Sequence, residues 1–358
     1  MAGYTPEGAH LVGSVPLSNA GEVFDVLGTT LGRWLRRIPD GETDDETGRR
    51  SLYVGYQRPV FADHPLFEVG PMRPEQAIPT AAIAPKPGVT AADLAFGDLG
   101  YATNALRSFE LFDGRQRSGK LPPHLRFEVC LPVPIESLVS LVAPEAHALV
   151  EPAYEAAMNR ELARILEGVP HQRLAIQWDI CNIIWMWEGW VPAQLASDHP
   201  SLKRALVDRV ARMSHATPPE VQMGYHFCYG DWNHRHLKEP GDTAVMAELA
   251  TELTAAVERR VDWLHLPVPI ERTDAAYFDP LARATLRPET ELYLGLVHFR
   301  DGVDGTRKRI DTAASVLQRP FGVAAECGLG RRPAERGGAP DTLADLLKVH
   351  AEVSRPVV

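Results

Sequence analysis

Short apolar runs alternate with longer amphipathic segments along the chain, and this alternation limits the folds that it can adopt. The short runs are rich in β-branched and aliphatic residues, as strands are, whereas the longer segments repeat apolar residues at helical spacing. Such alternation is typical of a parallel sheet joined by crossover helices. Eight strands are expected, at residues 9–14, 34–40, 126–132, 173–179, 221–227, 261–267, 291–297 and 320–326.

Helices are expected between these strands. In the segment 243–260, for example, Val245, Leu249, Leu253 and Val257 recur every four residues, as on a helix with one buried face. The expected helices span 20–32, about 102–115, 151–167, 201–214, 243–260, 305–318 and 341–353.

Eight strands in a chain of 358 residues predict a single (β/α)8 barrel over residues 1–358. The main alternative is a doubly wound open sheet. No GxGxxG or GxxxxGK[ST] motif follows an expected strand, which argues against the usual nucleotide-binding sites of such sheets.

One long insertion interrupts the alternation after the second strand. Residues 43–100 begin with a charged stretch and continue through seven prolines, which is too long for an ordinary loop. In a barrel this insertion would lie over the active-site face. It is therefore expected to be either a functional lid or binding loop, or else a surface excursion or oligomer contact.

Composition excludes several classes of protein. A formal charge of −10, from 37 basic and 47 acidic residues, argues against a nucleic-acid partner. No apolar run is long enough to span a bilayer, so no membrane partner is expected. The N-terminal residues lack the pattern of a secretory signal, and four cysteines do not make a disulfide framework. We therefore expect a cytoplasmic protein with reduced thiols.

Side chains that can bind metal or substrate lie at or after the ends of the expected strands. The carboxyl ends of barrel strands converge on one mouth, where barrel enzymes carry out their chemistry. The residues at these positions are Ser14, Glu42, Asp179, His226, Cys228, Glu271, His298 and Cys327.

Four of these residues form a candidate zinc site. In an extended segment, His226 and Cys228 point to the same side and can reach one ion. With Cys327 and Glu271 they make a tetrahedral set in which a weak ligand could be displaced. Alternatively, the cysteines are small core residues and Glu271 pairs with Arg272.

The remaining cysteines and histidines give weaker signals. Cys130 lies inside an expected strand and is expected in the core, whereas Cys181 lies near the mouth. His234 and His236 form a competing H-x-H metal motif, although their polar surroundings are typical of a solvated loop.

The ordered motifs resemble the C-terminal catalytic barrel of the cobalamin-independent methionine synthases, from about residue 9 to 335. The resemblance implies a zinc enzyme that activates homocysteine. The family's zinc motifs H-x-C, I-E and C-G-L match His226-Phe227-Cys228, Ile270-Glu271 and Cys327-Gly328-Leu329. Its substrate-binding motifs G-S, G-E and Q-x-D match Gly13-Ser14, Gly41-Glu42 and Gln177-Trp178-Asp179, and its proton-donating histidine matches His298.

The chain also departs from this family. The resemblance implies a form with the catalytic barrel alone, without the family's separate N-terminal barrel. Leu138 stands where the family has a tryptophan beneath the folate ring, and Trp185 stands near the position of its pterin-binding glutamate. Only a shifted Glu188-Gly189 could replace that glutamate. The thiol-activating half of the site is kept, and the folate half is largely absent.

The sequence thus predicts a zinc-dependent transferase that activates a homocysteine-like thiol for methyl or alkyl transfer, without folate polyglutamate. His298, Asp179 and Glu42 would be catalytic, and Gly13 and Ser14 would bind substrate with the two carboxylates. Two alternatives stay open: a thiol transferase acting on another alkyl carrier, like the epoxide–coenzyme M transferases, and a non-catalytic barrel that binds a thiol or zinc. The thiol, the alkyl donor and the oligomeric state are left open.

Overall fold

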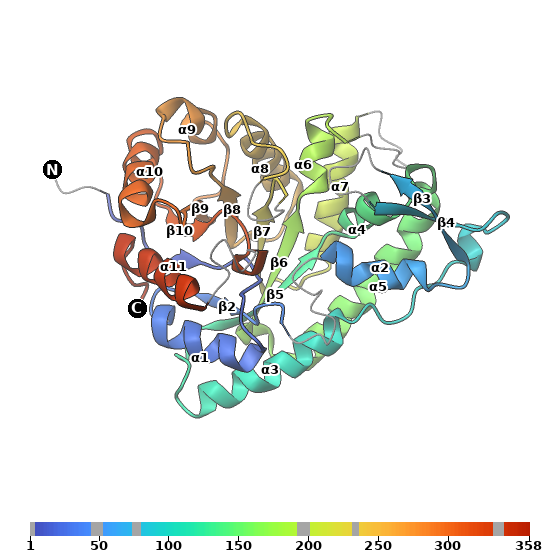
Figure 1. Cartoon of the computed structure of the whole chain (residues 1–358), viewed down its shortest axis with the longest axis horizontal. Helices are drawn as coiled ribbons and strands as arrows, with labels where there is room; N and C mark the ends of the chain where they lie inside the picture. Colours follow the sequence, from blue (N-terminus) through green and yellow to red (C-terminus); the bar gives the residue numbers. More distant parts are fainter. Residues whose placement is uncertain (1–3, 44–52, 74–79, 192–200, 231–235, 332–339) are drawn as a thin grey trace.

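The computed structural model describes residues 4–43, 53–73, 80–191, 201–230, 236–331 and 340–358. Its main sheet has eight parallel strands in the order β1-β10-β9-β8-β7-β6-β5-β2. Helices surround this sheet (Figure 1), as the sequence predicted for a (β/α)8 barrel. The eight strands are β1 Ala9–His10, β2 Arg37–Pro39, β5 Arg126–Pro132, β6 Leu174–Ile180, β7 Gln222–Phe227, β8 Trp263–Pro267, β9 Glu291–Val297 and β10 Gly322–Ala325.

The barrel is nearly closed between its first two strands. β1 pairs with β10 along one edge, through Ala9 and His10. On its other side, isolated parallel bridges join Ala9 to Leu35 and Ser14 to Gly41. These contacts bring the segments that follow β1 and β2 together at the mouth.

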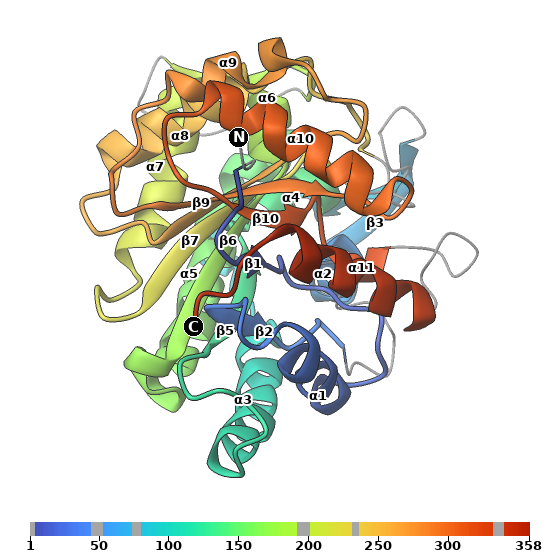
Figure 2. The same ribbon diagram turned by 90° about the vertical axis from the view of Figure 1, so that its left-hand side faces the viewer.

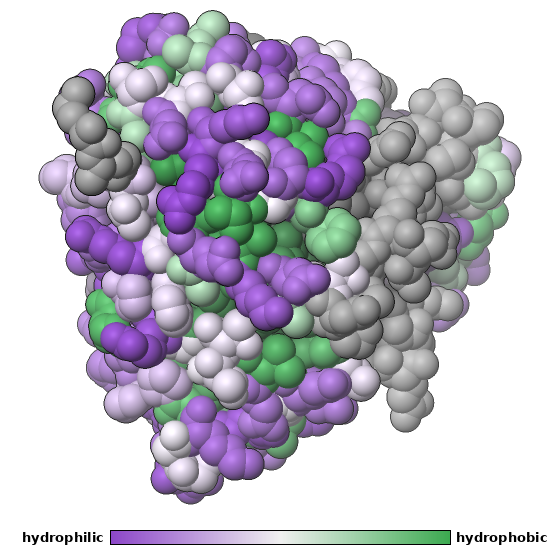
Figure 3. Space-filling model, turned by 60° about the vertical axis from the view of Figure 1, so that its left-hand side comes forward, coloured by the Kyte–Doolittle hydropathy of each residue, from purple (hydrophilic) through white to green (hydrophobic). Residues whose placement is uncertain are grey.

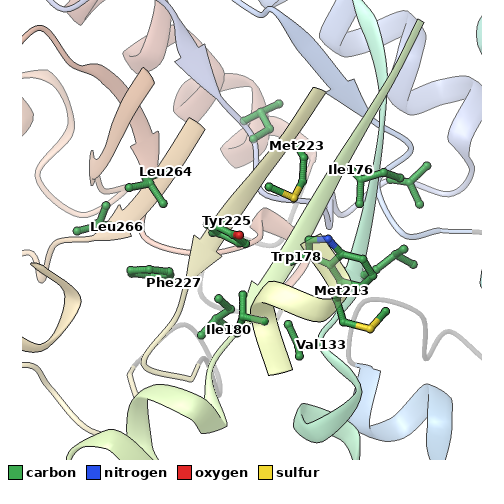
Figure 4. Close-up of a cluster of buried hydrophobic side chains, with 14 of the residues drawn as sticks. Val133, Ile176, Trp178, Ile180, Met213, Met223, Tyr225, Phe227, Leu264 and Leu266 are labelled. Carbon is green, nitrogen blue, oxygen red and sulfur yellow. The ribbon is translucent and has the colours of Figure 1, made fainter. Parts of the chain in front are cut away.

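Alternation along the strands separates an apolar outer layer from a polar interior. Ile176, Trp178 and Ile180 of β6 belong to the buried apolar cluster in Figure 4, with Tyr225 and Phe227 of β7. Burial of each such side chain contributes about 1.5–3 kcal/mol. The residues between them point into the barrel because successive strand residues face opposite sides.

The barrel interior holds buried charges away from the mouth. The guanidinium of Arg37 lies 4.1 Å from the Trp263 ring centroid and donates to Glu291 Oε2 at 2.8 Å. The Arg37 charge holds the pKa of Glu291 below its usual value, against the opposing effect of burial. The ion pair ties β2 to β9 inside the barrel, and the ring contact ties β2 to β8.

Helices cover the outside of the sheet and pack against one another. α11 contacts both α10 and α1, which closes the outer layer around the chain ends (Figure 2). Side chains that cap helix starts fix their ends: Asn19 accepts from the Glu22 amide and Asp274 from the Tyr277 amide. The helices are α1 Ala20–Leu31, α2 Tyr53–Ala62, α3 Tyr101–Arg117, α4 Pro134–Leu141, α5 His147–Gly168, α6 Asn182–Trp187, α7 Leu202–His215, α8 Ala244–Ala256, α9 Ala275–Ala282, α10 Gly302–Val316 and α11 Pro340–Val353.

The start of α5 and the end of α8 each lie four residues from their expected positions. α5 begins at His147 rather than near residue 151 and contains Pro152, because a proline close to the helix start removes a single backbone hydrogen bond. Val150 and Tyr154 are fully buried and anchor this first part of the helix. α8 ends at Ala256 rather than 260, since the chain turns there toward β8.

The insertion after β2 contains regular structure that the sequence patterns did not indicate. α2 is followed by an antiparallel hairpin of β3 (Phe67–Arg73) and β4 (Thr80–Pro85), and the short helix η1 (Ala91–Asp93) precedes α3. α2 packs against α4, and β4 also contacts α4. The insertion therefore rests on the helix that follows β5.

Polar residues cover most of the face shown in Figure 3, with small apolar groups between them. Among the described helices, none combines the length and apolar character needed to cross a membrane.

Candidate metal centre and substrate site

Three predicted metal ligands meet at the carboxyl end of the barrel. Cys228 follows β7, Cys327 follows β10, and His226 is the penultimate residue of β7. One ligand atom from each lies within 4.8 Å of the other two. Cys327 Sγ is 3.7 Å from Cys228 Sγ and 3.7 Å from His226 Nε2. All three residues are buried.

These distances fit a zinc ion. Tetrahedral zinc with bonds of about 2.3 Å to sulfur and about 2.05 Å to nitrogen separates two sulfurs by roughly 3.8 Å and a sulfur from a nitrogen by roughly 3.6 Å. The observed distances of 3.7 Å are close to both values. A disulfide needs about 2.05 Å, so the two thiols are not joined by a disulfide. Two sulfurs and one imidazole leave one tetrahedral position for a further ligand.

His226 is held by a second histidine. β7 and β8 pair so that His226 lies beside His265, and their Nδ1 atoms are 2.7 Å apart. His265 Nε2 donates to the Ala325 carbonyl at 2.9 Å. Burial lowers the pKa of His265 to about 4, which keeps its ring neutral. His265 belongs to none of the sequence motifs. Alternation along the strand Trp263–Pro267 could have indicated that its side chain faces the barrel interior.

Other buried side chains pack against one side of the two thiols. Cys181 and Trp185 pack with Cys228 and Cys327 in one buried cluster. The start of α6 is fixed by Glu136, whose carboxylate accepts from the amides of Cys181, Asn182 and Ile183 at 2.6–3.2 Å. This cap positions the α6 residues beside the thiols of Cys228 and Cys327.

Gly230 allows the chain after Cys228 to pass close to the Trp185 ring. It has a φ of +77°, and a Cβ at this position would lie 2.5 Å from the Trp185 ring. The Gly230 amide points to Cys228 Sγ at 3.3 Å, so it stabilises a thiolate there.

Glu271 is not brought into the three-residue group. It lies four residues beyond the end of β8, in a turn, and its side chain is exposed. Glu326 lies closer, because it directly precedes Cys327 and is buried. The sequence motifs do not identify Glu326, because the family's I-E motif matches Glu271 instead.

Glu326 faces two imidazoles. Its Oε2 is 3.8 Å from His298 Nδ1 and 3.6 Å from His236 Nε2. The His236 ring is buried rather than solvated, and its Nδ1 lies 2.9 Å from Glu239; His234, the other histidine of that motif, lies outside the described residues. His298 Nε2 donates to the Val268 carbonyl at 2.8 Å. The Glu326 carboxylate therefore lies nearest the His298 ring nitrogen that is not bonded to Val268.

The predicted substrate-binding residues form a second half of the site. A Cβ on Gly13 would lie 2.8 Å from Glu42 Oε1 and 3.3 Å from Cys130 Sγ, so all three meet at this glycine. Gln177 Nε2 lies 3.5 Å from Cys130 Sγ and 2.9 Å from Asp179 Oδ1. Desolvation, followed by nearby carboxylates including Asp179 and Glu42, raises the pKa of the Cys130 thiol. Two carboxylates near one thiol favour a cationic group between them.

Ser14 joins this half to the half that holds the predicted metal ligands. A Cβ on Gly328 would lie 2.1 Å from Ser14 Oγ, so the hydroxyl rests directly on the turn that follows Cys327. The Gly330 amide donates to the Ser14 carbonyl at 3.1 Å. The two halves are therefore contiguous.

The residues at the family's folate-binding positions are buried or contact other side chains of this protein. Leu138 is fully buried in α4 and offers no surface to a ligand. Glu188 accepts from the Tyr229 hydroxyl at 2.7 Å and pairs with Lys238. Trp185 lies edge to face with Trp190, with centroids 4.8 Å apart.

Together these features define the chain as a (β/α)8 barrel with a group of side chains able to hold a metal at its mouth. No protein-family model and no curated protein matches the sequence. Among solved structures, the chain is similar to a B12-independent methionine synthase from Shewanella sp. W3-18-1 in complex with selenomethionine, with a TM-score of 0.58, 11% identity and coverage of 98% of both chains. The resemblance seen in the sequence therefore holds at the level of the fold.

A carboxyl transferase domain from Rhizobium etli pyruvate carboxylase also matches, over 99% of this chain and 53% of that chain, at 13% identity. Its TM-score of 0.28 is too low to support an argument.

Proposed function

We propose that this protein is a zinc-dependent transferase that activates a homocysteine-like thiol for methyl or alkyl transfer. The observation that carries the proposal is the group of His226, Cys228 and Cys327, whose ligand atoms lie within 4.8 Å of one another. Two thiolates and one imidazole form a donor set that zinc prefers. Zinc bound there would supply Lewis acidity that keeps a substrate thiol deprotonated near neutral pH.

The other half of the site supports an amino-acid substrate. Glu42 and Asp179 would bind its ammonium group, since their negative charges both act on the space near Cys130. Each charge-assisted hydrogen bond contributes about 1.5–3 kcal/mol. Ser14 would orient the substrate between this ammonium site and the turn after Cys327. The similar Shewanella enzyme was solved with selenomethionine, an amino acid, which agrees with this assignment.

The reaction would form a carbon–sulfur bond and break the bond between the alkyl group and its carrier. The substrate sulfur supplies the electron pair, and the carrier leaves with the pair of the broken bond. His298 would donate the proton that the leaving group needs from Nδ1, where the Glu326 carboxylate lies 3.8 Å away. Trp185 and Cys181 would exclude water from the thiol.

The alkyl donor is proposed not to be a folate polyglutamate. Leu138 is fully buried where the resemblance requires an exposed stacking tryptophan. Glu188 is already bonded to Tyr229 and Lys238.

A screen of thiols against donors tests the proposed reaction. Zinc-loaded protein is incubated with L-homocysteine or coenzyme M and with a methylsulfonium, a methylfolate or an epoxide, and thioethers are detected by mass spectrometry. Formation of an amino-acid thioether, lost in Cys327→Ser, is expected. Product from coenzyme M and the epoxide alone would instead favour a transferase for another carrier. Zinc binding without any thioether would favour a non-catalytic barrel.

A further inference from the structure

We infer that His265 is a positioning residue of the metal centre, which holds His226 in the tautomer that presents Nε2 to the metal. The inference rests on the proposed function, because it concerns the orientation of a proposed zinc ligand. It does not depend on which thiol or alkyl donor is used.

Strand register brings the two histidines together. His226 of β7 and His265 of β8 are paired in the parallel ladder, so both side chains point into the barrel at the same level. Their Nδ1 atoms lie 2.7 Å apart, and the His265 side chain is fully buried. At this distance one nitrogen must carry the proton and the other must accept it.

A backbone carbonyl decides which nitrogen carries the proton. The Ala325 oxygen can only accept, so His265 Nε2, which is 2.9 Å away, bears a hydrogen. A neutral His265 ring then has a lone pair on Nδ1 and accepts from His226 Nδ1–H. His226 therefore carries its lone pair on Nε2, the atom that lies 3.7 Å from Cys327 Sγ.

The same two hydrogen bonds tie together the strands that carry the ligands. β9 separates β8 from β10, so the bond from His265 to Ala325 crosses the barrel interior. Ala325 lies two residues before Cys327, and His226 lies two residues before Cys228. His265 thus fixes both the ring of one ligand and the backbone next to another.

Replacement of His265 should weaken metal binding without removing a ligand. His265→Leu has no acceptor for His226 Nδ1–H, so the His226 ring can change tautomer. Loss of such an outer hydrogen bond typically weakens metal affinity 10–100-fold. His265→Gln keeps both an acceptor oxygen and a donor NH2 and should recover part of this loss. His147→Gln, which removes another buried imidazole bonded to a backbone carbonyl, is the matched control.

The tautomer can be measured in the metal-free wild-type protein. Nitrogen-15 NMR of the imidazole rings at pH 7.5, with the His226 signals assigned from a His226→Gln variant, should show a protonated Nδ1 and an unprotonated Nε2. A protonated Nε2 on His226 would overturn the inference, even if His265→Leu fails to fold.

Metal affinity is measured in parallel by competition between the protein and a chromophoric chelator for zinc. We expect His265→Leu to bind 10–100-fold more weakly than wild type and His147→Gln to be unchanged. Equal affinity in wild type and His265→Leu would also overturn the inference. A wild-type protein with the expected tautomer but no zinc affinity would refute the proposed function and leave the His265 contact standing.

Discussion

Cys228 and Cys327 are 99 residues apart in the sequence, yet their sulfur atoms lie 3.7 Å from each other at the mouth of the barrel. β7 and β10 are separated by two strands, so this contact exists only because the sheet curves into a barrel. Both thiols are buried beside Trp185, and the His226 imidazole completes a group of three side chains that could hold a metal.

This arrangement predicts about one zinc per chain. Cys228→Ser and Cys327→Ser should each lose most of the metal, because each removes one of two thiolates. Cys130→Ser, whose thiol lies outside the three-residue group, is the matched control and should retain it. Elemental analysis of the purified proteins measures the result. Equal zinc in wild type and both ligand variants would show that the metal assignment is wrong.

Glu271→Ala provides a separate measurement of the fourth ligand. Because Glu271 is exposed in the turn after β8, its removal should leave the zinc content unchanged. Loss of zinc in this variant would show that the turn folds over the site when metal binds.

Asp179 and Glu42 predict selectivity for a substrate with an amine. Asp179→Asn should weaken binding of L-homocysteine about tenfold or more, since a charge-assisted hydrogen bond contributes about 1.5–3 kcal/mol. It should hardly affect the deaminated analogue, 4-mercaptobutanoate. Isothermal titration with both ligands measures the difference. An equal loss for both ligands would argue against the amine contact.

Gly328→Ala should separate substrate binding from metal binding. Its new Cβ would lie 2.1 Å from Ser14 Oγ and would displace that hydroxyl, whereas the sulfur of Cys327 is not replaced. We expect wild-type zinc content with a higher KM for the amino-acid thiol. Loss of zinc would mean that the turn after Cys327 cannot shift without moving the ligand.

The site also predicts slow turnover with methyltetrahydrofolate triglutamate. Base–aromatic stacking contributes about 1–3 kcal/mol in nucleic-acid complexes, and the buried Leu138 cannot supply a comparable contact to a pterin. Without a stacking partner and a pterin-binding glutamate, this donor should bind about a hundredfold more weakly or worse. Each factor of ten in affinity corresponds to about 1.4 kcal/mol. Steady-state transfer to homocysteine by zinc-loaded protein measures it. Efficient turnover at micromolar donor would contradict the prediction.

The buried carboxyl group of Glu128 should lower the free energy of unfolding as the pH rises. Burial raises its pKa from 4.5 to about 8 in the folded protein, with Arg37 opposing the shift. Between these values the folded state keeps a proton that the unfolded chain releases, so stability decreases as pH rises through this window. At about 1.4 kcal/mol per pKa unit the loss is at most roughly 5 kcal/mol.

Glu128→Gln removes this titration. Its free energy of unfolding relative to wild type should therefore increase from pH 5 to pH 8.5, as measured by urea denaturation at each pH. Glu252→Gln, at an exposed position, is the control. A difference between Glu128→Gln and wild type that does not change with pH would rule out a buried, protonated Glu128.

The sequence by itself determined the eight strands and indicated the three residues, His226, Cys228 and Cys327, that could hold a metal. β5 and β9 have the expected bounds, because an apolar run of seven residues between turns has few other ways to bury its side chains. The insertion was less predictable, since β3 and β4 depend on pairing with each other and on packing against α4. Residues at strand ends could be identified as candidates because parallel strands end on one side of the sheet.

Only the tertiary structure decided which of these candidates meet. His226, Cys228 and Cys327 come together, whereas Glu271 lies four residues past the end of β8, in an exposed turn. The pairing of His226 with His265 depends on the register of two strands, and the bond to Ala325 depends on the distance across the barrel. Neither the strand register nor the distance across the barrel can be read from one segment of the sequence, because closure of the barrel sets both.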